Sequence, residues 1–237
     1  SRSEVQTMKG FDFPVEVLRT DRKRSAAIYV EHEIVKVRVP KSLSDKRIRE
    51  LVKKRTPWIK AKLKEISERP ISKPKEYVSG EAFSYLGKNY RLKVVVGDCS
   101  AIKLKGGYFH ATVLDSDQTP QATIRANLIS WYQQHAKNRL DDKIKRWAKI
   151  VGVEPNSVTV KDYKSRWGSC STKGDISFNW RIILAPHKIV DYVVVHELCH
   201  LQHLNHSPSY WRSVNRVIPD YKEHRQWLQS NERNLRV

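Results

Sequence analysis

The five residues from His196 to His200 have the sequence His-Glu-Leu-Cys-His, and they constrain this chain more than any other part of it. Valines at positions 190 and 193–195 precede the run and predict a buried helix. Two histidines four residues apart on a helix lie about 40° apart around its axis and about 6 Å apart along it, so both can reach one metal ion. Because unpaired polar groups are costly to bury, this pattern indicates a metal site rather than two surface histidines.

Glu197 directly follows the first histidine, which is the position of the general base in metal-assisted hydrolysis. A catalytic zinc site usually has three protein ligands and keeps one position for water. His206, ten residues after His196, is the predicted third ligand. We expect Asn205 to turn the chain after the helix and Ser207 to cap the next helix, so that His206 points back at the metal.

Two other residues are alternatives for the third ligand. His203 lies on the helix face of His196 if the helix continues, but its reach to a metal held by His196 and His200 is poor. Glu223 would complete a set of two histidines and one glutamate. The three-ligand pattern favours His206, and we then expect His203 at the rim of the site.

The segment from residue 165 to 184 precedes the metal helix, and we expect it to form a β-hairpin beside the site. Arg166 is a candidate to stabilise a developing negative charge or to bind a substrate carboxylate. Trp167 is a candidate for contact with the substrate or for support of the site. A purely structural stack of Arg166 with Trp167 is the alternative for both residues. Asn179 is a candidate to support the site by hydrogen bonding, and Tyr210 is a candidate for contact with the substrate or with the metal ligands.

The pattern of apolar and polar residues predicts an α+β fold without internal repeats. Short strands are expected within residues 13–39 and 76–114. Ser44 is expected to start a basic helix between these two regions. Pro57 marks either a break in that helix or the start of a second one.

A long helix is predicted from Pro120 to Val151, because its apolar residues recur on one face and Gly152 suits the helix end. A strand over residues 157–163, the hairpin and the metal helix follow it. We therefore expect two domains. Residues 1–115 form a β-rich N-terminal region with the basic helix, and residues 116–237 form a metal-binding catalytic domain with a helical core.

The net charge of +20 is concentrated in the N-terminal third. Residues 1–75 hold 21 Lys/Arg and 10 Asp/Glu, which is +11 of the total. A surface of this kind attracts polyanions through the release of their counterions. Nucleic acid is therefore a candidate partner through the basic N-terminal region, and a solvated basic face without a partner is the alternative.

The three cysteines, Cys99, Cys170 and Cys199, are far apart and odd in number, so they predict no disulfide framework. Cysteines without disulfide bonds are typical of a reducing compartment, and we therefore expect a cytoplasmic protein. The sequence has no run of about 18 apolar residues, so no membrane partner is expected. Its first residues also lack the hydrophobic core of a signal peptide.

Several of these residues form a set that is specific to one protein family. The set comprises the run Ser165–Ser171, Asn179, Ala185-Pro186, the run Asp191–Leu201, the run Asn205–Ser207, Trp211 and Pro219. It resembles the YgjP-like family of predicted zinc-dependent hydrolases, which is related to the SprT-like and WLM metallopeptidases. The N-terminal strands and the helix with Trp58-Ile59 extend the resemblance over nearly the whole chain.

The resemblance implies a zincin-like core in which His196, His200 and His206 bind Zn²⁺ and Glu197 is the catalytic base. It also implies a polypeptide substrate, without naming a physiological one. SprT-like and WLM relatives include proteases that act on DNA-bound proteins, which adds to the charge in favouring nucleic acid as a partner.

The resulting hypothesis is a zinc-dependent metallopeptidase in which Glu197 accepts a proton from a zinc-activated water. Two alternatives of other classes share the same motifs. A zinc-stabilised nucleic-acid-binding protein would use the charge and need no catalysis. A non-peptidase amide hydrolase would use the same site on a different substrate.

Overall fold

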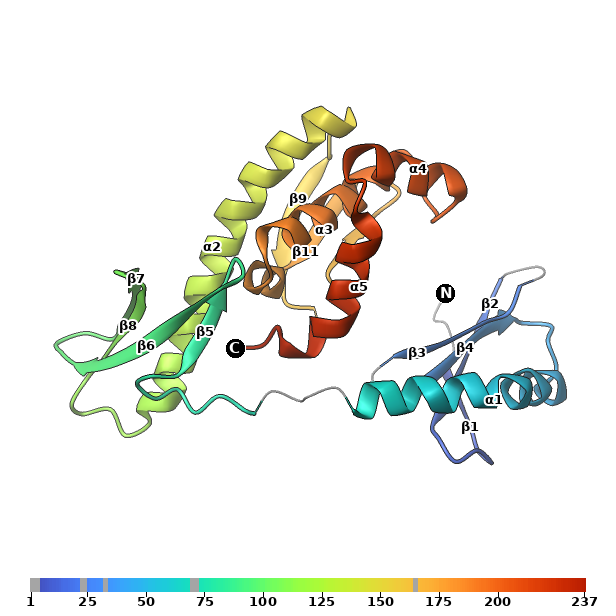
Figure 1. The fold of residues 1–237 in the computed structure, drawn as a ribbon, viewed down its shortest axis with the longest axis horizontal. Coiled ribbons are helices and arrows are strands. Elements are labelled where there is room, and N and C mark those ends of the chain that lie inside the picture. The colour runs from blue at the N-terminus through green and yellow to red at the C-terminus, as the bar shows by residue number, and fades with distance from the viewer. Residues whose placement is uncertain (1–4, 22–24, 32–33, 69–72, 164–165) are drawn as a thin grey trace. The chain divides into compact units, whose positions relative to one another are not determined.

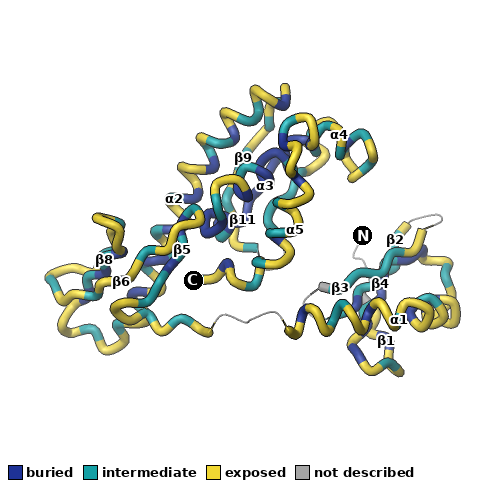
Figure 2. The backbone as a smooth tube through the Cα atoms, in the orientation of Figure 1, coloured by how far each residue is buried: buried dark blue, intermediate teal, exposed yellow. Residues whose placement is uncertain are grey.

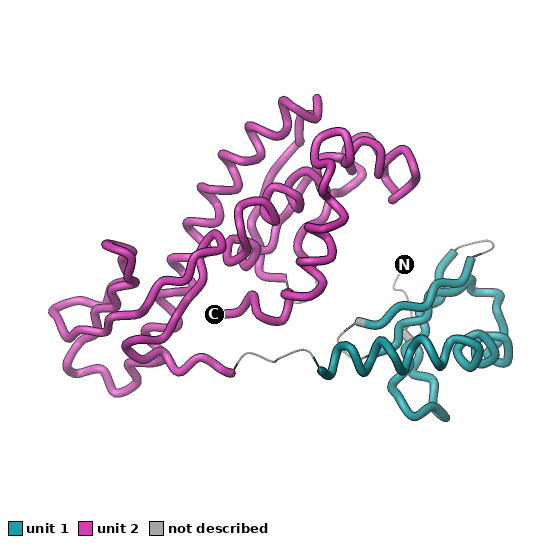
Figure 3. The backbone as a smooth tube through the Cα atoms, viewed as in Figure 1, with its two compact units in different colours: residues 1–71 teal, residues 72–237 magenta. Residues whose placement is uncertain are grey.

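The computed structural model describes residues 5–21, 25–31, 34–68, 73–163 and 166–237. Within these residues the fold is α+β, with three small sheets and five α-helices (Figure 1). The chain divides into two compact units, Ser1–Ile71 and Ser72–Val237 (Figure 3). The division lies near the Pro-rich stretch before residue 75, whereas we expected a domain boundary at residue 115.

The first unit is a mixed four-stranded sheet covered by one helix. Its strands are β1 (Val5–Met8), β2 (Val15–Thr20), β3 (Ala27–Glu31) and β4 (Ile34–Pro40), in the order β1-β2-β4-β3. The two central strands are parallel and both outer pairs are antiparallel. Val15, Val17, Val35, Val37 and Val39 are buried because side chains on a strand alternate between its faces.

Helix α1 (Asp45–Ser67) packs on this sheet through Ile48, Val52 and Ile59, all of which are fully buried. Ser44 caps the helix and accepts a hydrogen bond from the backbone N–H of Arg47, as predicted. Pro57 lies inside one continuous helix, so it marks neither a break nor a second start.

The second unit begins with a sheet of the same topology. Its strands are β5 (Ala82–Tyr85), β6 (Lys88–Val96), β7 (Ala101–Lys105) and β8 (Tyr108–Val113), in the order β5-β6-β8-β7. The central pair is again parallel, the outer pairs are again antiparallel, and a helix again follows the last strand. The sequence contains no internal repeat, so the shared topology of the two sheets is visible only in the structure.

Helix α2 (Pro120–Val151) follows this sheet and ends at Gly152, as the sequence predicted. Gly152 has a φ of 81°, a left-handed conformation that glycine adopts without strain. The buried residues Ile124, Leu128, Tyr132, Ala136 and Leu140 recur every four positions. They join the sheet β5–β8 and the rest of the second unit in one core, so these strands belong with the unit that contains the His196–His200 run rather than with the N-terminal region.

The third sheet lies beside the helix with the His196–His200 run, which is α3 (His187–Cys199). It contains β9 (Ser157–Lys161), β10 (Gly168–Cys170) and β11 (Asp175–Asn179), in the order β10-β11-β9. Strands β10 and β11 form the expected antiparallel hairpin. The predicted returning strand stops at Asn179, because the Asn179 side chain accepts a hydrogen bond from the N–H of Arg181 and caps the 3-10 helix η1 (Trp180–Leu184).

Three helices complete the second unit. They are α3 (His187–Cys199), α4 (Pro208–Val217) and α5 (Tyr221–Asn231), followed by the short 3-10 helix η2 (Glu232–Asn234). Helices α4 and α5 both pack against α3 in the same core. In the described ranges, every helix is too short or too polar to cross a membrane.

Candidate metal centre

Helix α3 carries the His196–His200 run through the core of the second unit. Nine of its thirteen residues are buried, including the valines at positions 190 and 193–195 (Figure 2). The helix ends at Cys199, and His200 is its C-terminal cap residue. The expected buried helix is therefore present, and it places both histidines at its C-terminal end.

The side chains of His196, His200 and His206 converge on one point. The Nε2 atom of His206 lies 3.2 Å from the Nε2 atom of His200 and 3.2 Å from that of His196. One nitrogen of each ring lies within 4.8 Å of the others. His196 and His200 are half-buried, whereas His206 is exposed. The point of convergence thus faces solvent on one side.

These distances match what a tetrahedral zinc ion requires. Zinc–nitrogen bonds of about 2.0–2.1 Å with tetrahedral angles place two ligand nitrogens about 3.3 Å apart. The Nε2 atom of His206 lies 3.2 Å from two other imidazole nitrogens, and three neutral rings cannot all donate hydrogen bonds to each other. A cation shared by the three lone pairs would satisfy them, so the residues fit a metal.

His206 reaches the other two histidines because the chain turns between α3 and α4. Ser207 caps α4 as predicted and accepts a hydrogen bond from the N–H of Tyr210. The prediction that Asn205 makes the turn in a left-handed conformation is wrong. Tyr77 and Leu86 are the described non-glycine residues with positive φ. Overlapping turns that start from the carbonyls of Glu197, Leu198 and Cys199 end the helix instead.

The imidazole rings are oriented by their surroundings. The Nδ1 atom of His200 lies 2.9 Å from the backbone carbonyl of His203, so Nδ1–H donates there and Nε2 keeps its lone pair. Tyr210 is fully buried and stacks on His200 with the ring centroids 4.6 Å apart. Trp211 stacks on His206 at 5.5 Å. Packing and one hydrogen bond therefore aim these rings before any ion binds.

All three histidines are favoured in the neutral form that binds metals. Burial, followed by the positive charges of His200 and His206, lowers the pKa of His196 to about 3. Burial is also the main cause that lowers the pKa of His200 and of His206. A metal therefore competes with few protons for these nitrogens at neutral pH.

Glu197 lies in a nearly closed position against strand β10. Its side chain is 5% exposed, and burial raises its pKa to about 8 against the opposing charge of Arg166. A Cβ atom at Gly168 would lie 2.6 Å from Oε1 and 2.7 Å from Cγ of Glu197. A Cβ atom at this position would force the Glu197 side chain to shift, so Gly168 is a further candidate site residue, which the sequence reasoning did not single out. The close approach between two distant segments leaves no local signal.

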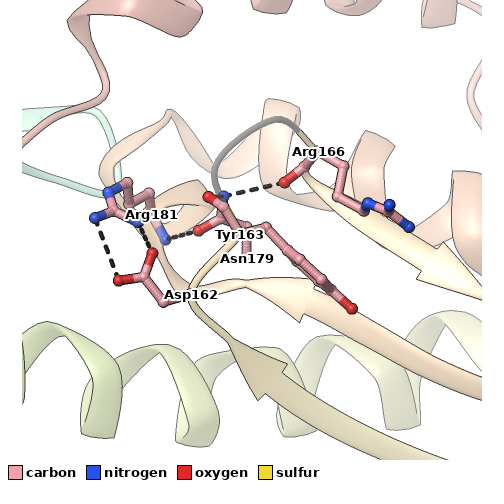
Figure 4. Close-up of polar contacts among 5 residues, drawn as sticks. All are labelled: Asp162, Tyr163, Arg166, Asn179 and Arg181. Carbon is pink, nitrogen blue, oxygen red and sulfur yellow. Dashed lines mark hydrogen bonds and ion pairs between the residues drawn. The ribbon is translucent and has the colours of Figure 1, made fainter. Parts of the chain in front are cut away.

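Asn179 acts on the loop that carries Arg166 rather than on the histidines. Its Nδ2 atom donates to the backbone carbonyls of Tyr163 at 2.9 Å and of Arg166 at 3.0 Å (Figure 4). Arg181, whose N–H is bonded by the same side chain, also pairs with Asp162. Asn179 thus ties the backbone of Tyr163 and Arg166 to the end of strand β11.

Arg166 and Trp167 have different surroundings. Arg166 is exposed, and its guanidinium lies 5.3 Å from the ring of Tyr163 (Figure 4). Trp167 is partly buried against the main core, and its backbone carbonyl accepts from the N–H of Asn179 at 2.8 Å. The expected alternative, a stack of Arg166 on Trp167, is replaced by the contact with Tyr163. Trp167 therefore packs structurally, while Arg166 remains available beside Glu197.

His203 and Tyr210 contact the three converging histidines without being part of that group. The His203 ring is directed to Ser213, with Nε2 3.0 Å from Oγ, while its backbone carbonyl orients His200. The hydroxyl of Tyr210 donates to the carbonyl of His196 at 3.0 Å. Both side chains are thus engaged with the protein. Glu223, the other alternative ligand, is exposed on α5 and is absent from the described group of converging side chains.

Residues 24–231 of the chain match the YgjP-like family model, described as its metallopeptidase domain. No curated protein matches the chain. Among solved structures, the chain is similar to the crystal structure of the metallopeptidase zymogen of Pyrococcus abyssi abylysin. The two are 26% identical, the similarity covers 38% of this chain and 92% of that chain, and the TM-score is 0.35.

Proposed function

The chain belongs to the YgjP-like family of metallopeptidases, and from that premise we propose that it is a zinc-dependent peptidase with a zincin-like catalytic core. The observation that carries the proposal is the convergence of three histidines, with Nε2 of His206 3.2 Å from Nε2 of both His196 and His200, next to the buried Glu197 on α3. This combination is what metal-assisted hydrolysis of a peptide bond requires.

His196, His200 and His206 are the residues that would hold the ion. Zinc bound there supplies Lewis-acid chemistry, since it makes a water more acidic and polarises a carbonyl oxygen. Within the described ranges the converging group has three members and one of them is exposed, which supports a site with a position left for water and substrate.

Glu197 is the proposed general base. Its carboxylate oxygens accept the proton of the attacking water and pass it to the leaving amine. Burial favours the protonated form of this side chain, and the charge of Arg166 opposes that effect. A zinc ion held by the three histidines would add to the charge of Arg166 in favouring the ionised carboxylate, which is the form that accepts a proton.

The proposed substrate is an extended polypeptide. Strand β10 is an edge strand of its sheet, and its first residue, Gly168, touches Glu197. An extended chain that pairs with such an edge would pass close to the carboxylate. Arg166, at the start of this edge, is the residue proposed to stabilise negative charge on the substrate or in the transition state.

The test is a comparison of zinc-loaded wild type with Glu197→Gln on a mixed peptide library, with products identified by mass spectrometry. We expect both proteins to retain one zinc and only the wild type to cleave. Glu223→Gln is the matched control, because it removes an exposed glutamate of the same unit. Cleavage by zinc-loaded Glu197→Gln at the wild-type rate refutes the assigned role of Glu197.

The same experiment separates the two alternative functions. If the chain is a zinc-stabilised nucleic-acid-binding protein, neither the wild type nor Glu197→Gln cleaves peptides. The protein then unfolds when zinc is removed. A non-peptidase amide hydrolase predicts intact peptides but a Glu197-dependent release of amine from small amides. Either result would replace the peptidase assignment.

A further inference from the structure

Helices α1 and α2 hold equivalent places after two sheets of the same topology, but their outer faces differ. Helix α2 packs on its own sheet and also against α3, η1 and β9, so it is covered on more than one side. Helix α1 packs on the sheet of its own unit through one side. Its remaining surface is exposed over most of its length (Figure 2).

The exposed surface of α1 is strongly cationic. The helix contains nine Lys/Arg and three Asp/Glu. Arg47, Lys62 and Lys64 pair with acidic side chains one turn away, and Lys60 pairs with Asp12. In the described part of the chain, no ion pair involves Lys46, Lys53, Lys54 or Arg55, all of which are exposed. Four positive charges are therefore left uncompensated on one helix.

Trp58 lies among these charges. It is 42% exposed, although tryptophan has the largest apolar surface of any side chain. Lys54 and Arg55 precede it by four and three residues, so they are its neighbours on the helix surface. We call Lys46, Lys53, Lys54, Arg55 and Trp58 the cationic face. It extends about 18 Å along the helix and about 200° around it, and Lys54, Arg55 and Trp58 lie within about 100° of one another.

We propose that the cationic face of α1 binds single-stranded nucleic acid. The uncompensated side chains would neutralise backbone phosphates and release their counterions. Trp58 would stack on an unpaired base, a contact that every base can make. The inference concerns the first unit and does not depend on the peptidase proposal for the second.

The composition of the face favours this occupant over two others. A membrane-surface helix needs its apolar face free to enter the lipid, but Ile48, Val52 and Ile59 are buried in the core of the first unit. Duplex DNA hides its bases in the stack, so it would use the charges and leave Trp58 without a role. A single strand uses both features.

The binding test uses the full-length, zinc-loaded protein and a fluorescein-labelled single-stranded DNA of about 20 nucleotides. Fluorescence anisotropy is measured between about 0.05 and 0.2 M salt, and the same is done with RNA and with the duplex. We expect affinity to fall with salt, and the slope to become less steep by about 2 in the triple variant Lys53→Gln, Lys54→Gln, Arg55→Gln.

The matched control removes three exposed lysines from the second unit: Lys103→Gln, Lys105→Gln, Lys149→Gln. It has the same net charge as the α1 triple variant, and we expect it to keep the wild-type slope. Equal loss of affinity in the two triple variants overturns the proposal, because binding would then follow net charge alone. Absence of wild-type binding at the lowest salt overturns it as well.

Trp58→Ala tests the stacking contact, with the melting temperature as the check on folding. We expect binding to the single strand to weaken by about tenfold while binding to the duplex changes little. An equal effect on both nucleic acids contradicts stacking on an unpaired base. Tighter binding of the wild type to phosphatidylserine vesicles than to the single strand would identify a membrane partner and overturn the proposal.

Discussion

Helices α3 and α1 differ in how far their polar side chains are buried. Helix α3 buries Glu197 and half-buries His196 within the largest core of the molecule. Helix α1 leaves nearly all of its charges in solvent. The comparison teaches that the environment, not the residue type, decides what a charged group does. Burial shifts the pKa of a carboxylate into the range that proton transfer needs. Exposed charged groups instead keep a protein soluble or attract a partner of opposite charge.

The strongest test of the buried side of this comparison is Gly168→Ala. The new methyl group would overlap the Glu197 carboxylate, which must then move. If Glu197 is the base, we expect kcat to fall by about 100-fold, because a misplacement of about 1 Å has effects of this size. Zinc content should stay at the wild-type level, as measured by metal analysis of the purified variant.

Ser169→Ala is the matched control for this substitution. Ser169 is the next residue on β10, and its hydroxyl bonds to Ser177 at 2.8 Å instead of contacting Glu197. We expect its kcat to stay close to wild type. An undiminished kcat in Gly168→Ala would show that the contact between β10 and α3 does not position the carboxylate.

The second test uses the pH dependence of stability in the metal-free protein. The folded-state pKa of Glu197 is raised from 4.5 to about 8, so its contribution to stability is complete below 4.5 and is lost as the pH rises through 8. His196, whose pKa is lowered from 6.5 to about 3, acts oppositely below pH 6.5. Between pH 6.5 and 8 we expect the free energy of unfolding to fall by about 2 kcal/mol because of Glu197.

Urea unfolding at several pH values measures this change. Glu197→Gln should lose the decrease between pH 6.5 and 8, because glutamine does not ionise. Glu50→Gln should keep it, since Glu50 is exposed on α1 and pairs with Arg47. The same slope in wild type and Glu197→Gln would mean that Glu197 ionises normally in the metal-free fold.

A smaller effect is expected for Tyr210→Phe. The substitution removes the hydroxyl that donates to the carbonyl of His196 but keeps the ring that stacks on His200. We expect a loss of about 1 kcal/mol in the free energy of unfolding, with kcat reduced less than in Gly168→Ala. A loss of zinc binding as large as that of His200→Ala would instead show that the hydroxyl acts on the ligands directly.

The smallest effect is expected on the exposed side of the comparison. Lys53→Gln on α1 should change the free energy of unfolding by less than about 0.5 kcal/mol and leave peptide cleavage unchanged. Thermal melting and the peptide assay check this together. A large destabilisation would break the comparison, because it would mean that α1 uses its charges for folding.

Local patterns allowed several features to be predicted closely. The limits of α2 follow from Pro120 at its start and Gly152 at its end, because both residues act through their own backbone conformation. The cap at Ser44 and the cap at Ser207 are likewise local hydrogen bonds. The offset of ten residues between His196 and His206 predicted a pair that the turn before α4 does bring together.

Features that depend on distant segments were missed or misplaced. The contact of Gly168 with Glu197, the bond from Tyr210 to His196 and the repeated sheet topology join residues that no sequence window holds together. The boundary that we expected at residue 115 lies between β8 and α2. The buried face of α2, however, packs on the sheet that contains β8. Apolar periodicity shows that a helix has a partner without showing which one.

By itself, the sequence predicted a metal site with three histidine ligands, since residue types and their spacing along one helix decide which ligands can reach one ion. It also determined the excess of positive charge in the N-terminal third. Tertiary structure alone decided which charges are buried and which are exposed. That decision sets the pKa of Glu197 and leaves the cationic face of α1 in water, because desolvation depends on neighbours that folding brings from elsewhere in the chain.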